Sequence, residues 1–464
     1  MRAVSLDAQG LWRDEVDALN FATAPWAEML ARFTQPGWNG PLYFLLLRGW
    51  IVLTGRTAFA MRYFSLLWGI LGVALTYPLG KRLAGHRAAV WAVLLTGFSP
   101  YLIWYAQEVK MYTWVPALVL LALYALERAC ERPRWGWWLL VLMATSFAFY
   151  SHILAALLIP IEVLWFLLQP HRHRRAWLGG LLTLGLLTLP YLPLLRWQWP
   201  LVFQTRQTGY PAHSLCEMAA TLAAGWSAGM GAQGQPFLAW GYLGLAVLGL
   251  GWLFLNRRGK WRYGLLLTGW LTLPLLVIWA ISLRAPIFTD RYLIWTAPAY
   301  YFLAGAGLAF LSQRQVRVMT LLALFLVSAA RVNLQQQATK PLKPQFREAA
   351  AYLQQKRGSE ELLLFQIPYN QITMAYYLPA SMSPWAAAPY TNWRTPEGNY
   401  QITPEVAGER TRTALDGHQH VWLVYSESPL WDERELVKTW LDAHSTLLIV
   451  QKFYGVILYH YQLD

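Results

Sequence analysis

The stretch 88–128 reads AAVWAVLLTGFSPYLIWYAQEVKMYTWVPALVLLALYALER, and it decides the fold. Two apolar runs, 88–105 and 112–128, flank a short polar segment that contains Gln107, Glu108 and Lys110. At about 1.5 Å per residue, each run is near the length that crosses roughly 30 Å of hydrocarbon. The stretch therefore predicts two membrane helices joined by a short charged loop.

The same pattern recurs along most of the chain. Of 464 residues, 56% are hydrophobic and 13% are charged, about half the charged share of a soluble domain. The 27 tryptophans and 25 tyrosines suit a protein with two bilayer interfaces. We expect a polytopic α-helical membrane protein with about ten transmembrane helices. The predicted spans are 59–80, 88–105, 112–128, 136–151, 153–169, 176–197, 237–256, 262–284, 291–311 and 316–332.

Basic residues gather in alternate loops between these spans. Five loops hold fifteen of them against two acids, Glu127 and Glu131. The positive-inside rule makes these loops cytoplasmic and places both ends of the chain outside. The formal charge of +14 is thus explained by topology and anionic lipid rather than by nucleic acid. The basic residues are Lys81, Arg82, Arg87, Arg128, Arg132, Arg134, Arg172, Arg174, Arg175, Arg257, Arg258, Lys260, Arg262, Arg314 and Arg317.

Three regions follow from this topology. Residues 1–58 form an extracytoplasmic first loop, 59–332 a transmembrane helical domain, and 333–464 a small extracytoplasmic α/β domain. The last region is predicted from β-type runs at 362–366, 421–425, 446–451 and 456–461, with helical patterns at 345–355 and 433–443. Residues 379–404 are rich in Pro, Tyr, Trp and Asn and are expected to form a long loop. Because 1–58 is expected outside, we also expect an upstream helix before Met1.

The two cysteines and the histidines predict no structural metal site. Cys130 and Cys216 fall on opposite sides of the membrane, so they cannot pair with each other. No Cys/His spacing is typical of structural zinc.

Polar residues that could carry chemistry lie at the outer ends of the predicted helices. They occur in the motifs 11–15, 99–112 and 288–293, and His152 ends the fourth span. Carboxylates and cations on one face can bind an anionic head group and take a proton from a hydroxyl. The alternative for each residue alone is a charge at a helix end that is simply solvated.

Taken in order, these motifs resemble a known family. The chain contains Leu-Trp-x-Asp-Glu at 11–15, Gly-Pro-Leu-Tyr at 40–43, Tyr-x-Gln-Glu-x-Lys-Met-Tyr at 105–112 and Arg-Tyr-Leu at 291–293. In this order, the four motifs resemble those of the C-type glycosyltransferase superfamily. The nearest branch is the bacterial group related to protein O-mannosyltransferases and lipid A aminoarabinose transferase. Such enzymes move a sugar from a polyprenyl-phosphate carrier to an acceptor outside the cytoplasm.

The resemblance implies a role for each motif residue. Asp14 would be the general base on the acceptor hydroxyl, Glu15 would shape its surroundings, and Glu108 would orient the acceptor or hold a divalent metal. Substrate would be bound by residues of the motifs at 105–112 and 291–293, in which Lys110 and Arg291 would contact the carrier phosphate. These substrate-binding candidates are Gln107, Lys110, Tyr112, Arg291 and Tyr292.

The chain also departs from the family pattern. Relatives commonly carry a His or a Glu-Lys pair where this chain has Trp38 and Asn39, so no metal is assigned. Relatives usually show Arg where this chain has Lys110, which neutralises phosphate as a point charge without a bidentate fork. His152 is an alternative metal ligand, or else a hydrogen-bonded interface residue. Glu162, in the middle of a span, is expected to be structural.

The predicted function is an inverting hexosyl or pentosyl transferase of the plasma membrane that builds cell-envelope glycans. Its partners would be a polyprenyl-phosphate-linked sugar, a lipid, glycan or protein acceptor, and membrane lipids. One alternative is a transporter or flippase of a lipid-linked sugar, although transporters usually bind substrate near the midplane. Another is a non-catalytic scaffold that displays the outer domain.

Overall fold

The chain divides into two compact units in a computed structural model. The structure describes residues 2–35, 38–169, 174–203, 210–230, 236–255, 260–311, 313–336, 341–387, 395, 399–427 and 432–463. Met1–Leu6 and Phe21–Gln335 form one unit, here called the helical unit. Asp7–Asn20 and Gln336–Asp464 form the other, here called the α/β unit.

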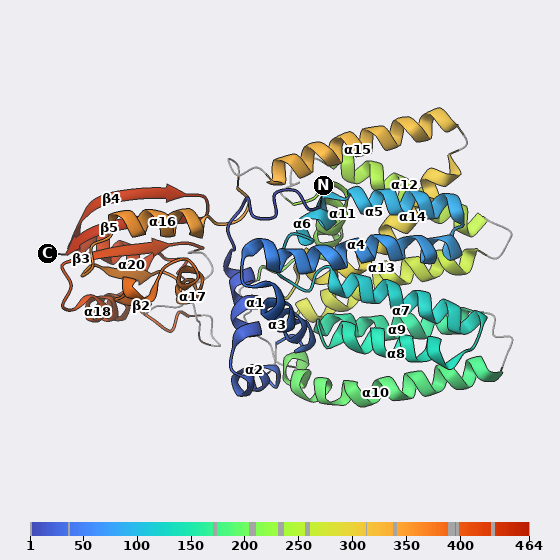
Figure 1. Ribbon diagram of the computed structural model, residues 1–464, viewed down its shortest axis with the longest axis horizontal. Coiled ribbons are helices and arrows are strands. Elements are labelled where there is room, and N and C mark those ends of the chain that lie inside the picture. The colour runs from blue at the N-terminus through green and yellow to red at the C-terminus, as the bar shows by residue number, and fades with distance from the viewer. Residues whose placement is uncertain are drawn as a thin grey trace. The chain divides into compact units, whose positions relative to one another are not determined.

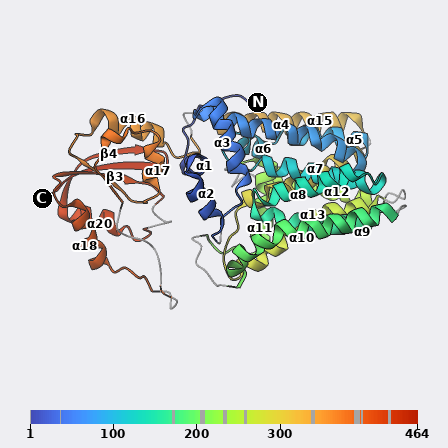
Figure 2. The same ribbon diagram turned by 60° about the horizontal axis from the view of Figure 1, so that its bottom comes forward.

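The helical unit consists of long apolar helices that run side by side in both views (Figure 1, Figure 2). Five of the described helices are long and apolar enough to cross a membrane, and three shorter apolar helices accompany them. The helices after α1 (Arg13–Thr23) are α2 (Trp26–Phe33), α3 (Leu42–Thr54), α4 (Ala58–Leu83), α5 (His86–Phe98), α6 (Pro100–Tyr105), α7 (Trp114–Glu131), α8 (Trp135–Phe149), η1 (Ile153–Leu157), α9 (Leu158–Leu168), α10 (Arg174–Phe203), α11 (Leu215–Ala228), α12 (Pro236–Leu255), α13 (Trp261–Ser282), η2 (Asp290–Thr296), α14 (Ala297–Phe310) and α15 (Arg314–Gln336).

Each predicted span coincides with one of these helices, or with two in succession, to within a few residues. The second span is broken: α5 ends before Ser99, and α6 starts at Pro100, which occupies the first helical position. Ser99 Oγ accepts a hydrogen bond from Leu102 N at 3.2 Å and pairs with Tyr301 OH at 2.7 Å. A proline needs no backbone partner at a helix start, so this break is locally satisfied. Helix α11 was not among the predicted spans.

Helix α14 lies at the centre of the helical unit, packed against α5, α12 and α13. Its crossing with α12 depends on glycines. A Cβ on Gly307 would lie 2.0 Å from Leu245 O, and one on Gly249 would lie 1.9 Å from Leu303 O. Small residues of this kind let two membrane helices approach closely.

One end of the helical unit carries the basic loops. Arg82 Nη1 lies 2.8 Å from Glu131 Oε2, and Lys260 Nζ donates to Arg82 O at 3.0 Å. Three of the predicted cytoplasmic loops therefore meet at one end of the bundle, as the alternation of basic loops predicts. Three residues of the predicted set, Arg172, Arg257 and Arg258, lie outside the described residues.

Near this end, a buried carboxylate joins three helices. Glu127 on α7 accepts from Trp165 Nε1 at 2.8 Å and Gln169 Nε2 at 2.6 Å, and from Tyr263 OH on α13 at 2.6 Å. A buried carboxylate is tolerated where donors satisfy its lone pairs. The sequence had placed Glu127 in a cytoplasmic loop, whereas it is 6% exposed and belongs to the packed interior.

The α/β unit contains a five-stranded sheet in the order β2-β1-β3-β5-β4. Strands β1, β2 and β3 are parallel, whereas β5 is antiparallel to both β3 and β4. One face packs on α16 and α17, and the other on α18 and α20. The elements are α16 (Phe346–Lys356), β1 (Leu362–Phe365), α17 (Asn370–Ala375), η3 (Ala380–Met382), β2 (Trp385–Ala387), α18 (Pro404–Leu415), β3 (His420–Tyr425), α20 (Leu436–His444), β4 (Ser445–Phe453) and β5 (Val456–Leu463).

The four predicted β-type runs correspond to β1, β3, β4 and β5, and the two predicted helices to α16 and α20. The sequence missed α17, β2 and α18. Strand β2 lies within the segment 379–404 that was expected to be a loop, of which 388–394 and 396–398 lie outside the described residues.

Candidate functional site

The predicted motif residues of the helical unit lie at the ends of helices opposite the basic loops. Helix α7 begins here with Trp114 and runs to Glu131 at the basic end. The short helix η2 packs against α7, α11 and η1, which brings the motif at 288–293 beside the motif at 99–112. The two motifs are therefore neighbours in the fold although more than 170 residues separate them.

A tyrosine links the two motifs. Tyr105, at the end of α6, donates from its hydroxyl to Asp290 Oδ2 at 3.4 Å. Its ring lies 5.1 Å from that of Tyr112, edge to face. Glu108, three residues further along the chain, is 1% exposed. Tyr105 is thus the centre of a polar group in an otherwise apolar bundle.

Arg291 lies against aromatic rings. Its Cζ is 6.0 Å from the centroid of the Tyr112 ring, within the range of a cation–π contact. The next residue, Tyr292, shares a hydrogen bond with Tyr210 OH at 3.2 Å, and its ring lies 5.5 Å from that of His152. His152 is 3% exposed and is 6.5 Å from the Tyr112 ring.

These residues form what we call the outer-end cluster. It contains a guanidinium, two carboxylates, one imidazole and three phenols, held on short helices and loops rather than on long spans. A guanidinium binds phosphate through paired hydrogen bonds, and aromatic faces pack against sugar rings and lipid. The cluster is therefore chemically suited to an anionic, carbohydrate-bearing ligand. Its members are Tyr105, Glu108, Tyr112, His152, Asp290, Arg291 and Tyr292.

Two predicted substrate-binding residues contact the chain itself. Gln107 is 9% exposed, and its amide donates to Arg2 O and to Val4 O, both at 2.9 Å. Lys110 is half-buried, and its carbonyl accepts from Ser65 Oγ at 3.4 Å. Its assignment to the carrier phosphate stays a prediction, as does that of Arg291.

The Gly-Pro-Leu-Tyr motif has a structural role. A Cβ on Gly40 would lie 2.0 Å from Tyr150 O, so the chain can pass here only with glycine. Asn39 Oδ1 accepts from Ile153 N at 3.2 Å, and Leu42 N donates to Tyr150 O at 3.2 Å. The motif thereby fixes the loop that carries His152.

The sequence alone leaves the roles of His152 and Glu162 open. The metal-ligand role considered for His152 stays a prediction. Glu162 is buried and accepts from Thr145 Oγ1 on α8 at 2.6 Å. That helix-to-helix bond agrees with the structural role expected for Glu162.

The Asp-Glu motif lies in the α/β unit, in the first turn of α1. Glu15 is fully buried and pairs with Lys343 Nζ at 3.0 Å. Asp14 is half-buried on the neighbouring position. The buried pair fixes the first turn of α1. The roles expected for Asp14 and Glu15 stay predictions.

The residues before this motif are held by the C-terminal part of the same unit. Arg347 donates to Asp7 O at 3.0 Å and Ala8 O at 2.8 Å. Gln9 Oε1 accepts from Lys343 N at 3.1 Å, and Tyr377 OH donates to Leu11 O at 2.9 Å. Asp14 is therefore carried on a segment that these contacts hold in place.

Sequence reasoning left out Tyr105, Asp290 and Lys343. The first two stand inside the quoted motifs, so their polarity at an outer helix end was a usable signal. Lys343 stands between Pro341 and Pro344 outside any motif, and its partner is 328 positions away, so no local pattern points to it.

Known proteins resemble this chain in sequence and in fold. Residues 35–197 match the family model described as dolichyl-phosphate-mannose-protein mannosyltransferase. No curated protein sequence matches the chain.

Solved structures match over nearly the whole chain. ArnT from Cupriavidus metallidurans, solved in the apo state and bound to undecaprenyl phosphate, is 16% and 15% identical respectively, with a TM-score of 0.63 over 99% of this chain and 95% of that one. The oligosaccharyltransferase AglB from Archaeoglobus fulgidus, with an inhibitory peptide and a dolichol-phosphate, is 11% identical, with a TM-score of 0.53 over 91% of this chain and 66% of that one. The mycobacterial arabinofuranosyltransferase AftD is 14% identical, with a TM-score of 0.51 over 100% of this chain and 39% of that one. The chain is a multi-pass membrane protein with the fold of the C-type glycosyltransferase superfamily, as its motifs predict.

Proposed function

We propose that this protein transfers a sugar from a polyprenyl-phosphate carrier to an acceptor hydroxyl at the outer face of the plasma membrane. The observation that carries the proposal is the outer-end cluster, in which Arg291 lies against Tyr112 and near His152 at the end opposite the basic loops. Solved proteins of this fold hold undecaprenyl phosphate or dolichol-phosphate, which supports a lipid-linked donor.

The proposed reaction is an inverting displacement at the anomeric carbon. Asp14 takes the proton of the acceptor hydroxyl, whose oxygen forms the new bond to that carbon. The bond to the phosphate oxygen breaks, and polyprenyl phosphate leaves with the electron pair. Lys110 and Arg291 stabilise the charge on the departing phosphate, while Glu108 orients the acceptor. Because phosphate already activates the sugar, a base, positive charge and positioning are sufficient.

The competing function is a flippase that moves the lipid-linked sugar without reacting. Transporters usually place polar binding groups near the midplane, on broken helices. Glu162 carries a carboxylate inside α9, but one of its oxygens accepts a hydrogen bond from Thr145. The outer-end cluster, in contrast, gathers charged groups at one end of the bundle, which favours the transferase.

The test uses the full chain in detergent or nanodiscs. Polyprenyl-phosphate sugars are supplied with candidate acceptors, and sugar transfer and carrier release are followed by mass spectrometry. The wild-type protein is expected to release carrier and form glycosylated acceptor in equal amounts. A parallel measurement uses the full chain in sealed vesicles, where movement of the carrier across the bilayer without its release would support the flippase instead.

Two variants with matched controls assign the residues. Asp14→Asn is nearly isosteric but cannot act as a base, so turnover should fall by at least about 100-fold. Asp7→Asn in the same segment is the control, since Asp7 is exposed, and should keep wild-type turnover. Arg291→Gln should weaken donor binding, whereas Arg284→Gln, exposed at the end of α13, should not. Near-normal turnover of the Asp14 variant would remove it from the mechanism.

A further inference from the structure

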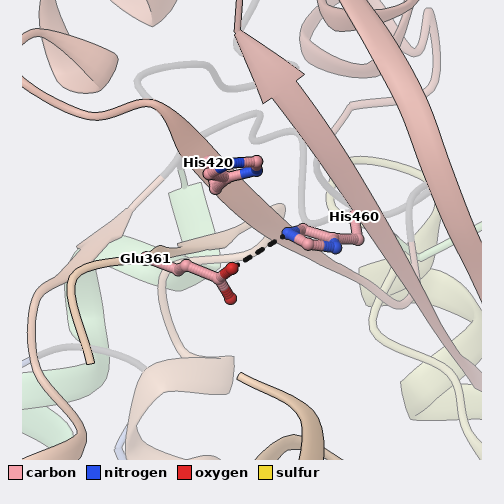
Figure 3. Close-up of side chains that lie close together, drawn as sticks. All are labelled: Glu361, His420 and His460. Atoms are coloured by element: carbon pink, nitrogen blue, oxygen red, sulfur yellow. Dashed lines mark ion pairs between the residues drawn. The ribbon is translucent and has the colours of Figure 1, made fainter. Parts of the chain in front are cut away.

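Three side chains that could bind a metal lie together at one end of the sheet in the α/β unit. Glu361 stands directly before β1, His420 is the first residue of β3, and His460 lies in β5 (Figure 3). They come from three neighbouring strands and are not part of any sequence motif discussed above.

The strand register explains why the three side chains meet. Leu362 pairs with Val421, and Trp422 pairs with His460. Since side chains alternate between the two faces of a sheet, Glu361, His420 and His460 all lie on the face that carries Trp422. They occupy the edge of that face, beyond its apolar core.

The spacing of their ligand atoms is close to that of a zinc site. One atom from each residue lies within 4.8 Å of the others, and Glu361 Oε1 is 3.4 Å from His460 Nε2. Zinc binds nitrogen and oxygen at about 2.0–2.2 Å in tetrahedral geometry, which sets ligand atoms about 3.3–3.5 Å apart. One pair already has this spacing, and a side-chain rotation of His420 would bring in the third.

Groups around the cluster hold these ligands in orientation. Glu361 Oε2 accepts from Trp422 Nε1 at 2.7 Å and from Gly358 N at 2.9 Å, which leaves Oε1 toward His460. The His460 ring stacks on Trp422 with centroids 4.2 Å apart and planes 1° from parallel. Outer contacts that fix a carboxylate and an imidazole in this way are typical of metal sites.

Polar atoms of the cluster are buried without a hydrogen-bond partner. This holds for His420 Nδ1 and for both ring nitrogens of His460, among the residues that the structure describes. His460 is only 7% exposed, so desolvation of these nitrogens is costly. A Glu361–His460 ion pair would use Nε2 and leave the other two atoms without a partner.

We propose that Glu361, His420 and His460 bind one zinc ion, with the fourth position open to water or an added ligand. Two imidazoles and a carboxylate form a donor set that zinc prefers. Glu361 and His420 are half-buried, which gives the ion a path from solvent. The ion would tie the ends of β1, β3 and β5 together, independently of the transfer reaction.

The experiment measures zinc in the full chain purified in detergent. The protein is stripped with a chelator, equilibrated with zinc sulfate at buffered free zinc, and freed of unbound metal before elemental analysis. We expect wild type to hold one zinc per chain more than His420→Gln. The matched control is His418→Gln, a half-buried histidine two residues away that is not part of the cluster and should keep the wild-type content. The comparison between variants removes any contribution from zinc bound elsewhere.

Two further readouts separate a zinc site from a structural role. Cobalt in place of zinc should give the visible absorption bands of tetrahedral cobalt in wild type and His418→Gln, but not in His420→Gln. Zinc should raise the melting temperature of wild type and leave that of His420→Gln unchanged. His460→Gln and Glu361→Gln repeat the measurement should the first variant fail to fold. Equal zinc content in wild type and in the folded cluster variants would overturn the proposal.

Discussion

The pair Glu15–Lys343 should be the most sensitive ionic contact of the α/β unit. Glu15 Oε2 and Lys343 Nζ are 3.0 Å apart, and their side chains are 0% and 5% exposed. Lys343→Met keeps most of the volume of the side chain but removes its charge from beside a buried carboxylate. Loss of one partner of a buried pair costs about 3–5 kcal/mol, against about 0.2–1 kcal/mol for an exposed pair.

This free energy converts to a measurable change in melting temperature. For a unit of this size, 1 kcal/mol shifts the midpoint by about 3 °C, so Lys343→Met should lower it by about 10 °C. The measurement is thermal unfolding of the full chain in detergent, followed by intrinsic fluorescence. Glu15→Gln should also destabilise, because it removes the negative charge from beside the buried ammonium group.

The double variant tests whether the pair itself is responsible. Glu15→Gln with Lys343→Met should be at least about 2 kcal/mol more stable than the sum of the single effects, since no buried charge remains unpaired. Disruption of Arg13–Glu427, a 3.6 Å pair with side chains 22% and 20% exposed, is the comparison and should cost about 1 kcal/mol or less. A fall of under 2 °C for Lys343→Met, or additive single effects, would refute this reasoning.

Three other outcomes are expected. Glu127→Ala removes the acceptor of the buried Trp165 indole, at about 1–3 kcal/mol, and of the half-buried Gln169 and Tyr263 side chains, so the protein should lose thermal stability in detergent. Unchanged melting would show that Glu127 does not stabilise the packing of these helices. Gly307→Leu places a side chain against a backbone carbonyl of α12 and should abolish folded expression, measured by gel-filtration yield. Burial opposes a low pKa for Asp442, but hydrogen bonds from Lys438 and Tyr461 outweigh it and hold that pKa below its ordinary value. The stability this gives is present above about pH 4 and is lost as the pH falls further, so the difference in melting temperature between wild type and Asp442→Asn should shrink below that pH.

Much of the helical unit was predictable because its driving force is local. A long apolar run has to satisfy its backbone within a helix, so runs such as 59–80 and 262–284 mark α4 and α13 directly. The break at Ser99 was harder, because a Ser-Pro pair also occurs inside continuous membrane helices. Helix α11 was missed because its 14 residues are too few to span the membrane, although its sequence is apolar.

Less of the site was predictable, because its contacts join residues that are remote in sequence. The motifs located Tyr112, Arg291 and Tyr292 at one end of the bundle, and their contacts with His152 follow from helix packing. Gln107 shows the limit of motif reasoning, since its amide holds Arg2 and Val4. No Cys/His spacing in the sequence predicts zinc, because Glu361, His420 and His460 come together only through strand register.

Asp7–Asn20 belongs to the same unit as the C-terminal residues, and this limits how domains of the protein can be exchanged. A chimaera that receives the C-terminal domain of a relative would confront Glu15 with a foreign residue at the position of Lys343. Arg347 and Tyr377, which hold the first segment, would be exchanged at the same time. Any swap meant to transfer acceptor preference should therefore move 7–20 together with 336–464, as a module that is continuous in space but not in the gene.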